Sequence, residues 1–323
     1  MSSEPRQVLI MGRPRTGTTL VSNLLNSQPR STVLSDLLST PLMEARRRGG
    51  FERALTAVER NRCLFAVKWE LRATSRRLEV GPDGFRTLAE LYDRALRALG
   101  SPGDHVVGHK IAGLEQVLPQ VLEQTAVRCI YVVRDVRDVA LSQWNVSPRG
   151  ITLSIYAWKQ GVQIARSLAP HPRLLLLRFE DLVTDPARAV RPVEALLGRP
   201  VRTDLEELRH DAAPWIENSA FHDVERVLDP RPSGRWRREP DHPLVRHAAW
   251  ACASELEQLG YDAPDLSALT WRDRGGLVAT RVAVAALKQG GRGARAAMRL
   301  LLTTFPAVED LIWPHTGSLL RGV

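Results

Sequence analysis

The segment Gln7–Asn26 joins three patterns that together restrict the fold of this 323-residue chain. Gln7–Met11 is a short run of mostly branched apolar residues, which is typical of a buried strand. A loop with glycine at both ends, Gly12–Gly17, follows it, and from Thr18 onward apolar residues recur with helical spacing. Strand, glycine loop and helix in this order bring backbone N–H groups and a helix N-terminus to one place, where a phosphate can bind.

The loop lacks the lysine of the P-loop found in nucleotide hydrolases. That pattern is G-x-x-x-x-G-K-[ST], in which the lysine reaches the outer phosphates and the hydroxyl holds Mg²⁺. Here Gly12 and Gly17 have the required separation, but Thr18 stands in place of the lysine and Arg15 supplies a cation inside the loop. A glycine pair alone would indicate only a turn before a core helix. The full string favours a loop that grips one phosphate while Arg15 faces a transferable group.

Further apolar runs alternate with helical patterns along the chain. Strands are predicted at Thr32–Leu34, His105–Ile111, Val127–Val133 and Arg173–Phe179, and helices at Phe85–Leu99, Leu114–Gln124, Ile151–Leu168 and Leu244–Leu259. This alternation predicts an α/β fold with three layers, α/β/α, a mainly parallel central sheet and a P-loop-like nucleotide-binding core. Residues 1–262 are expected to form this domain, and residues 263–323 a helical C-terminal extension packed on the core.

The chain carries a formal net charge of +9, and almost all of its cations are arginines. Nucleic-acid binding is one explanation for a basic chain. However, the arginines are scattered, and the sequence contains no aromatic RNA-binding motif, zinc finger or basic helix. An anionic small-molecule ligand and a compositional bias explain the charge better, so no nucleic-acid partner is expected.

Targeting, metal and cysteine patterns indicate a cytoplasmic protein. The first apolar run is too short for a secretion signal, and no segment has the uninterrupted apolar length of a membrane span, so no stable membrane insertion is expected. Cys63, Cys129 and Cys252 are odd in number and far apart, which indicates buried thiols in a reducing compartment. No His/Cys/Asp cluster suggests a metal site. A homodimer is left open.

A second cluster of functional residues follows the strand Val127–Val133. Arg134 leaves the strand end, where its guanidinium fork can take two oxygens of a phosphate. Ser142 lies two helical turns further on, on the same side of the following helix, and can donate another hydrogen bond. By itself the string Arg134–Asp138, RDVRD, is typical of a surface salt-bridge cluster.

Three strings in this order resemble motifs of the PAPS-dependent sulfotransferases. PRTGTTL, beginning at Pro14, is similar to the family's 5′-phosphosulfate loop, and YVVRDVRDVALSQW, ending at Trp144, is similar to its 3′-phosphate motif. Arg231–Arg238 resembles a glycine-bearing loop that covers the nucleotide. A further string, LRFEDLVTDP, resembles the segment after a core strand in the same family. The resemblance spans about residues 7–260. It implies an enzyme that moves a sulfuryl group from PAPS to an acceptor hydroxyl by in-line transfer.

The resemblance also implies residue roles. Backbone N–H groups from Thr16 to Thr19, including Gly17, would hold the 5′-phosphate with the Thr18 and Thr19 hydroxyls. Arg15 and Lys110 would neutralise the sulfonate or the leaving group. The residues expected to hold the 3′-phosphate and cover the nucleotide are Arg134, Ser142, Ser233, Gly234, Arg235 and Trp236.

The acceptor hydroxyl needs a general base, and three residues are candidates. Some relatives use a glutamate shortly after the first helix, where this chain has Asp36, and others use a histidine near the position of His109. Asp36 is the first choice and His109 the second, with Glu70 in reserve, although an Asp at this position can also cap a helix. A small-molecule or glycan acceptor is expected, whether a sugar, a phenol or a secondary-metabolite alcohol. The alternative function is a nucleotide kinase-like P-loop phosphotransferase.

Overall fold

The computed structural model describes residues 4–72, 74–146, 151–204, 230–270, 274–278 and 280. The chain divides into two compact units. The first contains the described residues up to Val133, together with 163–204 and 230. The second contains Arg134–Val162 and the described residues from Arg231 onward.

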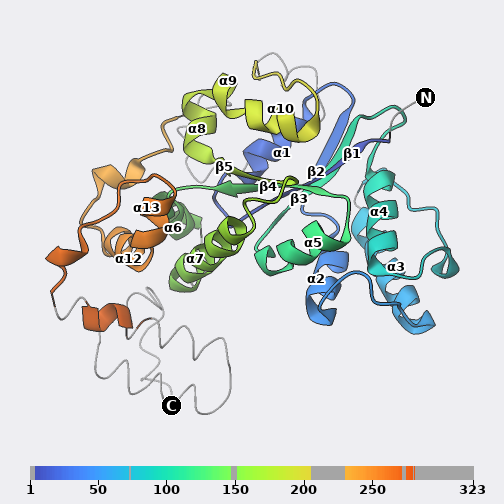
Figure 1. Cartoon of the computed structure of the whole chain (residues 1–323), viewed down its shortest axis with the longest axis horizontal. Coiled ribbons are helices and arrows are strands. Elements are labelled where there is room, and N and C mark those ends of the chain that lie inside the picture. Colours follow the sequence, from blue (N-terminus) through green and yellow to red (C-terminus); the bar gives the residue numbers. More distant parts are fainter. Residues whose placement is uncertain are drawn as a thin grey trace, which may run out of the picture. The chain divides into compact units, whose positions relative to one another are not determined.

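The first unit is built on a five-stranded parallel sheet with the strand order β2-β3-β1-β4-β5 (Figure 1). The strands are β1 (Arg6–Gly12), β2 (Ser31–Ser35), β3 (Val106–Ala112), β4 (Arg128–Val133) and β5 (Leu174–Arg178). All five predicted strands are therefore confirmed, with ends displaced by at most one residue. Because every pair is parallel, the carboxyl ends of the strands meet at one edge, where open α/β sheets bind their ligands.

Helices cover both faces of this sheet, which confirms the predicted α/β fold with a parallel central sheet. One face carries α1 (Thr18–Asn26), α8 (Phe179–Thr184), α9 (Pro186–Ala189) and α10 (Arg191–Leu197) (Figure 1). Its core includes Ile10 from β1, Leu24 from α1 and Val193 from α10, all buried. On the opposite face, Tyr92 of α4 (Leu88–Leu99) contacts β3. The predicted helix Leu114–Gln124 consists of a 3₁₀ turn, Glu115–Val117, and α5 (Leu118–Gln124).

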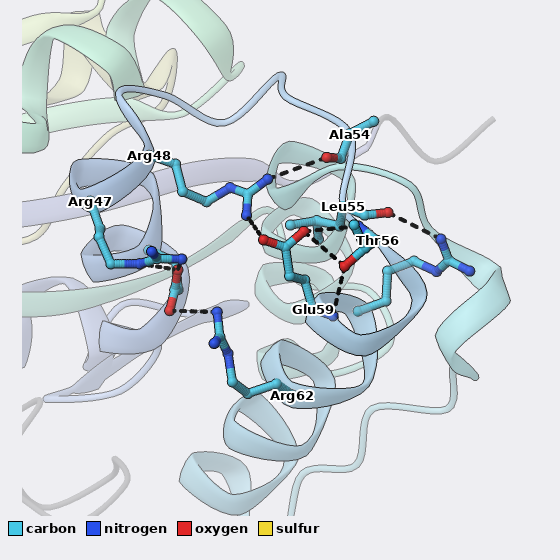
Figure 2. Close-up of polar contacts among 9 residues, drawn as sticks. Arg47, Arg48, Ala54, Leu55, Thr56, Glu59 and Arg62 are labelled. Atoms are coloured by element: carbon cyan, nitrogen blue, oxygen red, sulfur yellow. Dashed lines mark hydrogen bonds and ion pairs between the residues drawn. The ribbon is translucent and has the colours of Figure 1, made fainter.

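The helices α2 (Ser39–Arg48) and α3 (Ala57–Leu71) form a hairpin that is fastened where α2 ends and α3 begins. The buried Arg48 side chain pairs with Glu59 and donates to the Ala54 carbonyl (Figure 2). Thr56 and Glu59 form a capping box, in which each side chain accepts from the other residue's backbone N–H. The Thr56 N–H, followed by Arg48, lowers the pKa of Glu59 to about 2. This network fixes the geometry of the turn between the two helices.

The second unit is helical in its described part. It contains α6 (Val136–Val146), α12 (Pro243–Ala251), α13 (Ala253–Gln258) and α7 (Ile151–Ser167) as far as Val162. Lys159 donates to the Ala251 carbonyl at 2.7 Å and pairs with Glu255 at 3.1 Å, so it ties α7 to the α12–α13 segment. The predicted helix Leu244–Leu259 is interrupted at Cys252. Most of the expected extension 263–323 lies outside the described residues and stays a prediction. None of the helices in the described ranges is long and apolar enough to cross a bilayer.

Candidate functional site

A tight turn, Arg13–Thr16, follows directly after β1. The Thr16 N–H donates to the Arg13 carbonyl at 3.2 Å, and the Thr16 hydroxyl donates to the same oxygen at 2.8 Å. Pro14 is the second residue of this turn, and Arg15, the third, has φ +71°, as in a type II turn. Glycine normally takes that third position, because the left-handed conformation costs an L-residue roughly 1–2 kcal/mol. Such strained residues concentrate at functional sites, which fits the role predicted for Arg15.

Two glycines allow the chain to pack closely around this turn. A Cβ atom on Gly12 would lie 2.5 Å from the Val132 carbonyl oxygen and 2.8 Å from the Thr16 hydroxyl. A Cβ on Gly17 would lie 2.4 Å from the Phe179 ring, and Gly17 has φ +94°. Gly17 is also the N-cap of α1 and has no side chain with which to cap it. The result is bare backbone at a helix N-terminus, which suits an anion.

Asp36 and Lys110 come together at the same edge of the sheet. Asp36 directly follows β2, and its carboxylate lies 2.7 Å from the Lys110 ammonium. The Asp36 N–H also donates to the Lys110 carbonyl at 2.7 Å. The Asp36 side chain is 68% exposed, whereas the Lys110 side chain is only 5% exposed. A cation held inside the protein thus faces a carboxylate that an external molecule can reach.

The backbone around Asp36 is strained. Asp36 has φ +59° and Leu38 has φ +55°, so two non-glycine residues in this short turn are left-handed. Leu38 is fully buried. The two residues after Leu38 are bound by Glu70, which lies on α3. Its carboxylate accepts from the backbone N–H and the hydroxyl of both Ser39 and Thr40, at 2.5–2.9 Å. Glu70 therefore holds the beginning of α2, a role that argues against it as the reserve general base.

His109 is a poor candidate for the general base. Successive residues of a strand point to opposite faces of the sheet. Lys110 is in register with Ile10, whose side chain packs with α1, so His109 points toward α4. There it has no exposed surface, and its Nε2 shares a 2.7 Å hydrogen bond with the Tyr92 hydroxyl. Burial lowers the pKa of His109 to about 3. An acceptor molecule has no access to it, so His109 belongs to the core.

In the second unit, Arg134 and the 233–236 loop are brought together by Asp138 and Pro232. Arg134 directly follows β4 in sequence, and its guanidinium donates to the Pro232 carbonyl at 2.6 Å. Asp138 accepts from the Gly234 N–H at 2.6 Å and from the Trp236 N–H at 3.0 Å. It also lies 3.9 Å from Arg134. Burial raises the pKa of Asp138, opposed by the Arg134 cation and these two N–H groups.

Trp236 packs against arginine side chains. The Arg137 guanidinium lies over the indole, 3.6 Å from the ring centroid, and that of Arg237 lies 4.7 Å away. Asp135 holds Arg137 through both of its carboxylate oxygens, at 2.7 and 2.9 Å for the shorter contacts. Ser142 is buried on α6 in the same unit. The string that looked like a surface salt-bridge cluster is thus a buried scaffold for the loop after Pro232.

Sequence reasoning assigned no role to two residues that hold these groups in place. Asp138 anchors the 233–236 loop, and its position four residues after Arg134, one helical turn away, could have indicated it. Phe179 packs against Gly17 from the start of α8. It occurs in the string LRFEDLVTDP, but nothing in the sequence pairs it with a residue more than 150 positions earlier.

A glycine-flanked turn without the P-loop lysine, at the carboxyl edge of a parallel sheet, gives this chain a P-loop-like α/β fold. A model of the sulfotransferase family matches residues 5–204. This match covers more than half of the chain, so the protein belongs to the sulfotransferase family. Family membership does not favour the kinase-like alternative.

The chain is also similar to individual proteins. Human carbohydrate sulfotransferase 6 is 27% identical over an alignment of 179 residues, with coverage of 45% of this chain and 45% of that protein. The sulfotransferase domain of the olefin synthase from Synechococcus PCC 7002 has 17% identity and a TM-score of 0.50, with coverage of 81% of this chain and 97% of that one. The sulfotransferase domain of the curacin biosynthetic pathway has 14% identity and a TM-score of 0.48, with coverage of 81% and 100%. The chain thus matches less than half of its human relative.

Proposed function

We propose that this protein is a PAPS-dependent sulfotransferase that transfers a sulfuryl group to a hydroxyl of an acceptor. The observation that carries the proposal is the juxtaposition, at one sheet edge, of a strained arginine-bearing turn and the Asp36–Lys110 pair. Asp36 directly follows β2, Lys110 lies near the carboxyl end of β3, and the turn directly follows β1. These three strands are neighbours in the sheet. Family membership supports the same conclusion.

The residues around the turn have the properties that a phosphosulfate donor requires. PAPS, when bound, supplies the sulfuryl group attached to its 5′-phosphate. In the proposal, N–H groups from Thr16 to Thr19 and the hydroxyls of Thr18 and Thr19 hold that phosphate. The bare backbone at Gly12 and Gly17 fits this role. Arg15 would balance the charge of the transferred group. Because a sulfonate carries less charge than a terminal phosphate, fixed cations can stabilise the transfer.

Arg134 and Ser142 are proposed to bind the 3′-phosphate, the group that distinguishes PAPS from simpler nucleotides. Ser233, Gly234, Arg235 and Trp236 would cover the nucleotide. The hydrogen bonds from Gly234 and Trp236 to Asp138 fix this loop and support the proposal.

Asp36 is proposed as the general base that removes the proton of the acceptor hydroxyl. Its exposure allows an acceptor to approach, and the ion pair with the Lys110 ammonium at 2.7 Å holds the carboxylate in place. Sulfuryl transfer resembles phosphoryl transfer, in which positioning and electrostatic stabilisation supply most of the catalysis. The strained backbone at Asp36 and Leu38 serves that positioning, since it fixes where the carboxylate points.

The acceptor is proposed to be a small molecule or a glycan, and the similarity to a carbohydrate sulfotransferase supports a sugar hydroxyl. We place the enzyme in the cytoplasm. All three cysteines are buried thiols outside any disulfide, which fits a reducing compartment.

A thermal-shift panel tests the proposed function. It compares 3′,5′-ADP (PAP, the desulfated donor), ATP with Mg²⁺, and a DNA oligonucleotide. A ligand that binds only the folded protein raises its melting temperature, and at a given concentration a tighter ligand raises it more. We expect stabilisation by PAP alone. A shift with ATP–Mg²⁺ and none with PAP would indicate the kinase-like function, and a salt-sensitive shift with DNA would indicate a nucleic-acid-binding protein.

A further inference from the structure

A buried ion pair lies beside the phosphate-binding turn, between residues to which the proposed mechanism gives no role. The Arg13 guanidinium lies 3.4 Å from the Glu115 carboxylate, and the two side chains are 16% and 1% exposed. Arg13 directly follows β1, and Glu115 lies in the 3₁₀ turn after β3. Gly113 joins the two strand ends, because its N–H donates to the Gly12 carbonyl at 3.1 Å. A Cβ atom on Gly113 would lie 3.3 Å from the guanidinium, so this glycine leaves it room.

Arg13 is the first residue of the turn, and its backbone accepts the hydrogen bonds that close the turn. Its carbonyl oxygen accepts both hydrogen bonds from Thr16. These two bonds close the turn in which Arg15 has φ +71°. A strained residue keeps its conformation only where its surroundings determine it. The position of Arg13 therefore decides whether Arg15 stays in place.

Stability does not explain this ion pair well. Burying two charges costs free energy that only excellent hydrogen bonds repay. The separation of 3.4 Å is longer than a normal N–H···O bond. The second carboxylate oxygen of Glu115 and the Nε of Arg13 are buried without a hydrogen-bond partner. Burial also raises the pKa of Glu115, even though the nearby Arg13, and more weakly Arg46, favour its ionised form.

We propose that Glu115 is a positioning residue of the donor site. It acts through Arg13, whose side chain it holds, and so fixes the turn that presents Arg15 and the N–H groups after it. Glu115 touches neither donor nor acceptor in this proposal. The effect expected on donor affinity rests on the proposed function. The effect expected on the order of the Arg13–Thr16 turn does not.

Two measurements on the full chain test this role separately. The first is amide hydrogen exchange of the unliganded protein, comparing wild type with Glu115→Gln. The Thr16 amide should exchange at least about fivefold faster in the variant, while the amides of β4 should be unchanged, because only local opening of the turn is affected. This readout needs no nucleotide, so it tests the proposal even if PAP does not bind.

The second measurement is a double-mutant cycle of PAP affinity, determined by calorimetry well below the melting temperature. Glu115→Gln, Arg13→Met and the double variant should each weaken PAP binding by about tenfold, because residues that act as one unit are not additive. Arg13→Lys keeps the positive charge but loses the planar guanidinium group, so PAP affinity is expected to fall by about threefold. Glu123→Gln, an exposed glutamate on α5, is the matched control and should bind as wild type.

Either of two results would overturn the proposal. One is an unchanged Thr16 exchange rate in Glu115→Gln, which would make the pair a purely structural contact. The other is a double variant about a hundredfold weaker than wild type, which would mean that Arg13 and Glu115 act independently. If Glu115→Gln does not fold, Arg13→Lys, whose side chain is partly exposed, provides the same two readouts.

Discussion

Two regions of the protein use charge in opposite ways. One is the sheet edge of the first unit, where Asp36 pairs with Lys110. The other is the Arg134 cluster of the second unit, which consists of Arg134, Asp138 and the 233–236 loop. At the sheet edge, the Asp36 carboxylate is exposed and sits on a left-handed backbone. In the cluster, Asp138 is buried and satisfied by backbone N–H groups. The first arrangement leaves a carboxylate within reach of another molecule, and the second uses a buried carboxylate to fix a loop.

This difference separates chemistry from recognition. A general base must be reached by its substrate, so its geometry has to come from the backbone and from a single partner such as Lys110. A recognition loop must keep its shape without ligand, so it is built on buried charges with several hydrogen bonds. Substitutions at the sheet edge should therefore change turnover, and substitutions in the Arg134 cluster should change nucleotide affinity.

The largest expected effect is on turnover in Asp36→Asn. The amide keeps the shape of the side chain but cannot accept the acceptor's proton, so kcat should fall by about 10³, within the usual range for a general base. PAP affinity should stay within about twofold of wild type, because Asp36 is not proposed to touch the donor. Steady-state kinetics and calorimetry provide the two values.

Asp83→Asn is the matched control for this substitution, since Asp83 is a highly exposed carboxylate in the same unit. It should leave turnover unchanged. Wild-type turnover in Asp36→Asn would remove the assignment of the base.

The next effect concerns the Arg134 cluster. In Asp138→Asn only one acceptor oxygen remains for two N–H groups, so the 233–236 loop should lose its fixed shape. We expect PAP affinity to fall by about 30-fold, equivalent to about 2 kcal/mol for a lost charge-assisted hydrogen bond. Asp265→Asn, at an exposed aspartate in the same unit, should have no effect. Equal PAP affinity of Asp138→Asn and wild type would show that the loop does not contact the nucleotide.

A pair of glycine substitutions tests the packing of the donor turn. Gly17→Ala combines a left-handed φ with a Cβ atom 2.4 Å from Phe179, whereas Gly49 has φ +78° and no atom near its Cβ position. Gly49→Ala should lower the free energy of unfolding by about 1 kcal/mol, and Gly17→Ala by about 3 kcal/mol. Urea unfolding measures both. Equal losses would mean that Phe179 moves aside without cost.

The last prediction separates His109 from the Asp36–Lys110 pair at the sheet edge. The pKa of His109 is lowered to about 3 in the folded protein, below its usual value of 6.5. The unfolded chain therefore takes up this proton first as the pH falls. The free energy of unfolding should decrease from pH 6.5 downward, by at most about 1.4 kcal/mol per pH unit. His109→Gln should remove this slope in urea titrations and keep wild-type turnover at pH 7.5, whereas a loss of turnover would restore His109 as a base.

The sequence was sufficient to predict the sheet because each strand is a short apolar run next to turn residues. The positions of the Gly12–Gly17 loop and of Arg134, at the ends of β1 and β4, were also predictable, since they depend on spacing within one strand–loop–helix segment. The contacts that hold such residues in place could not be predicted. Phe179 against Gly17 and Glu70 against Ser39 are contacts between distant parts of the chain, and no local pattern records them.

His109 and Lys110 show the same limit. His109 and Lys110 are neighbours in sequence, and residue type alone made both reasonable participants. Only the register of β3 against β1 decides that Lys110 shares the face of α1 while His109 points into the opposite core. A one-residue change of register would have exchanged their positions.

The central claim is that Arg134 recognises the 3′-phosphate, the group that distinguishes PAPS from simpler nucleotides. Calorimetric titration of wild type and Arg134→Met with PAP and with 5′-AMP, which lacks the 3′-phosphate, tests it most directly. We predict that wild type prefers PAP by about a hundredfold, the equivalent of a charge-assisted bidentate contact, and that Arg134→Met binds the two nucleotides alike. An undiminished preference for PAP in Arg134→Met would contradict the claim.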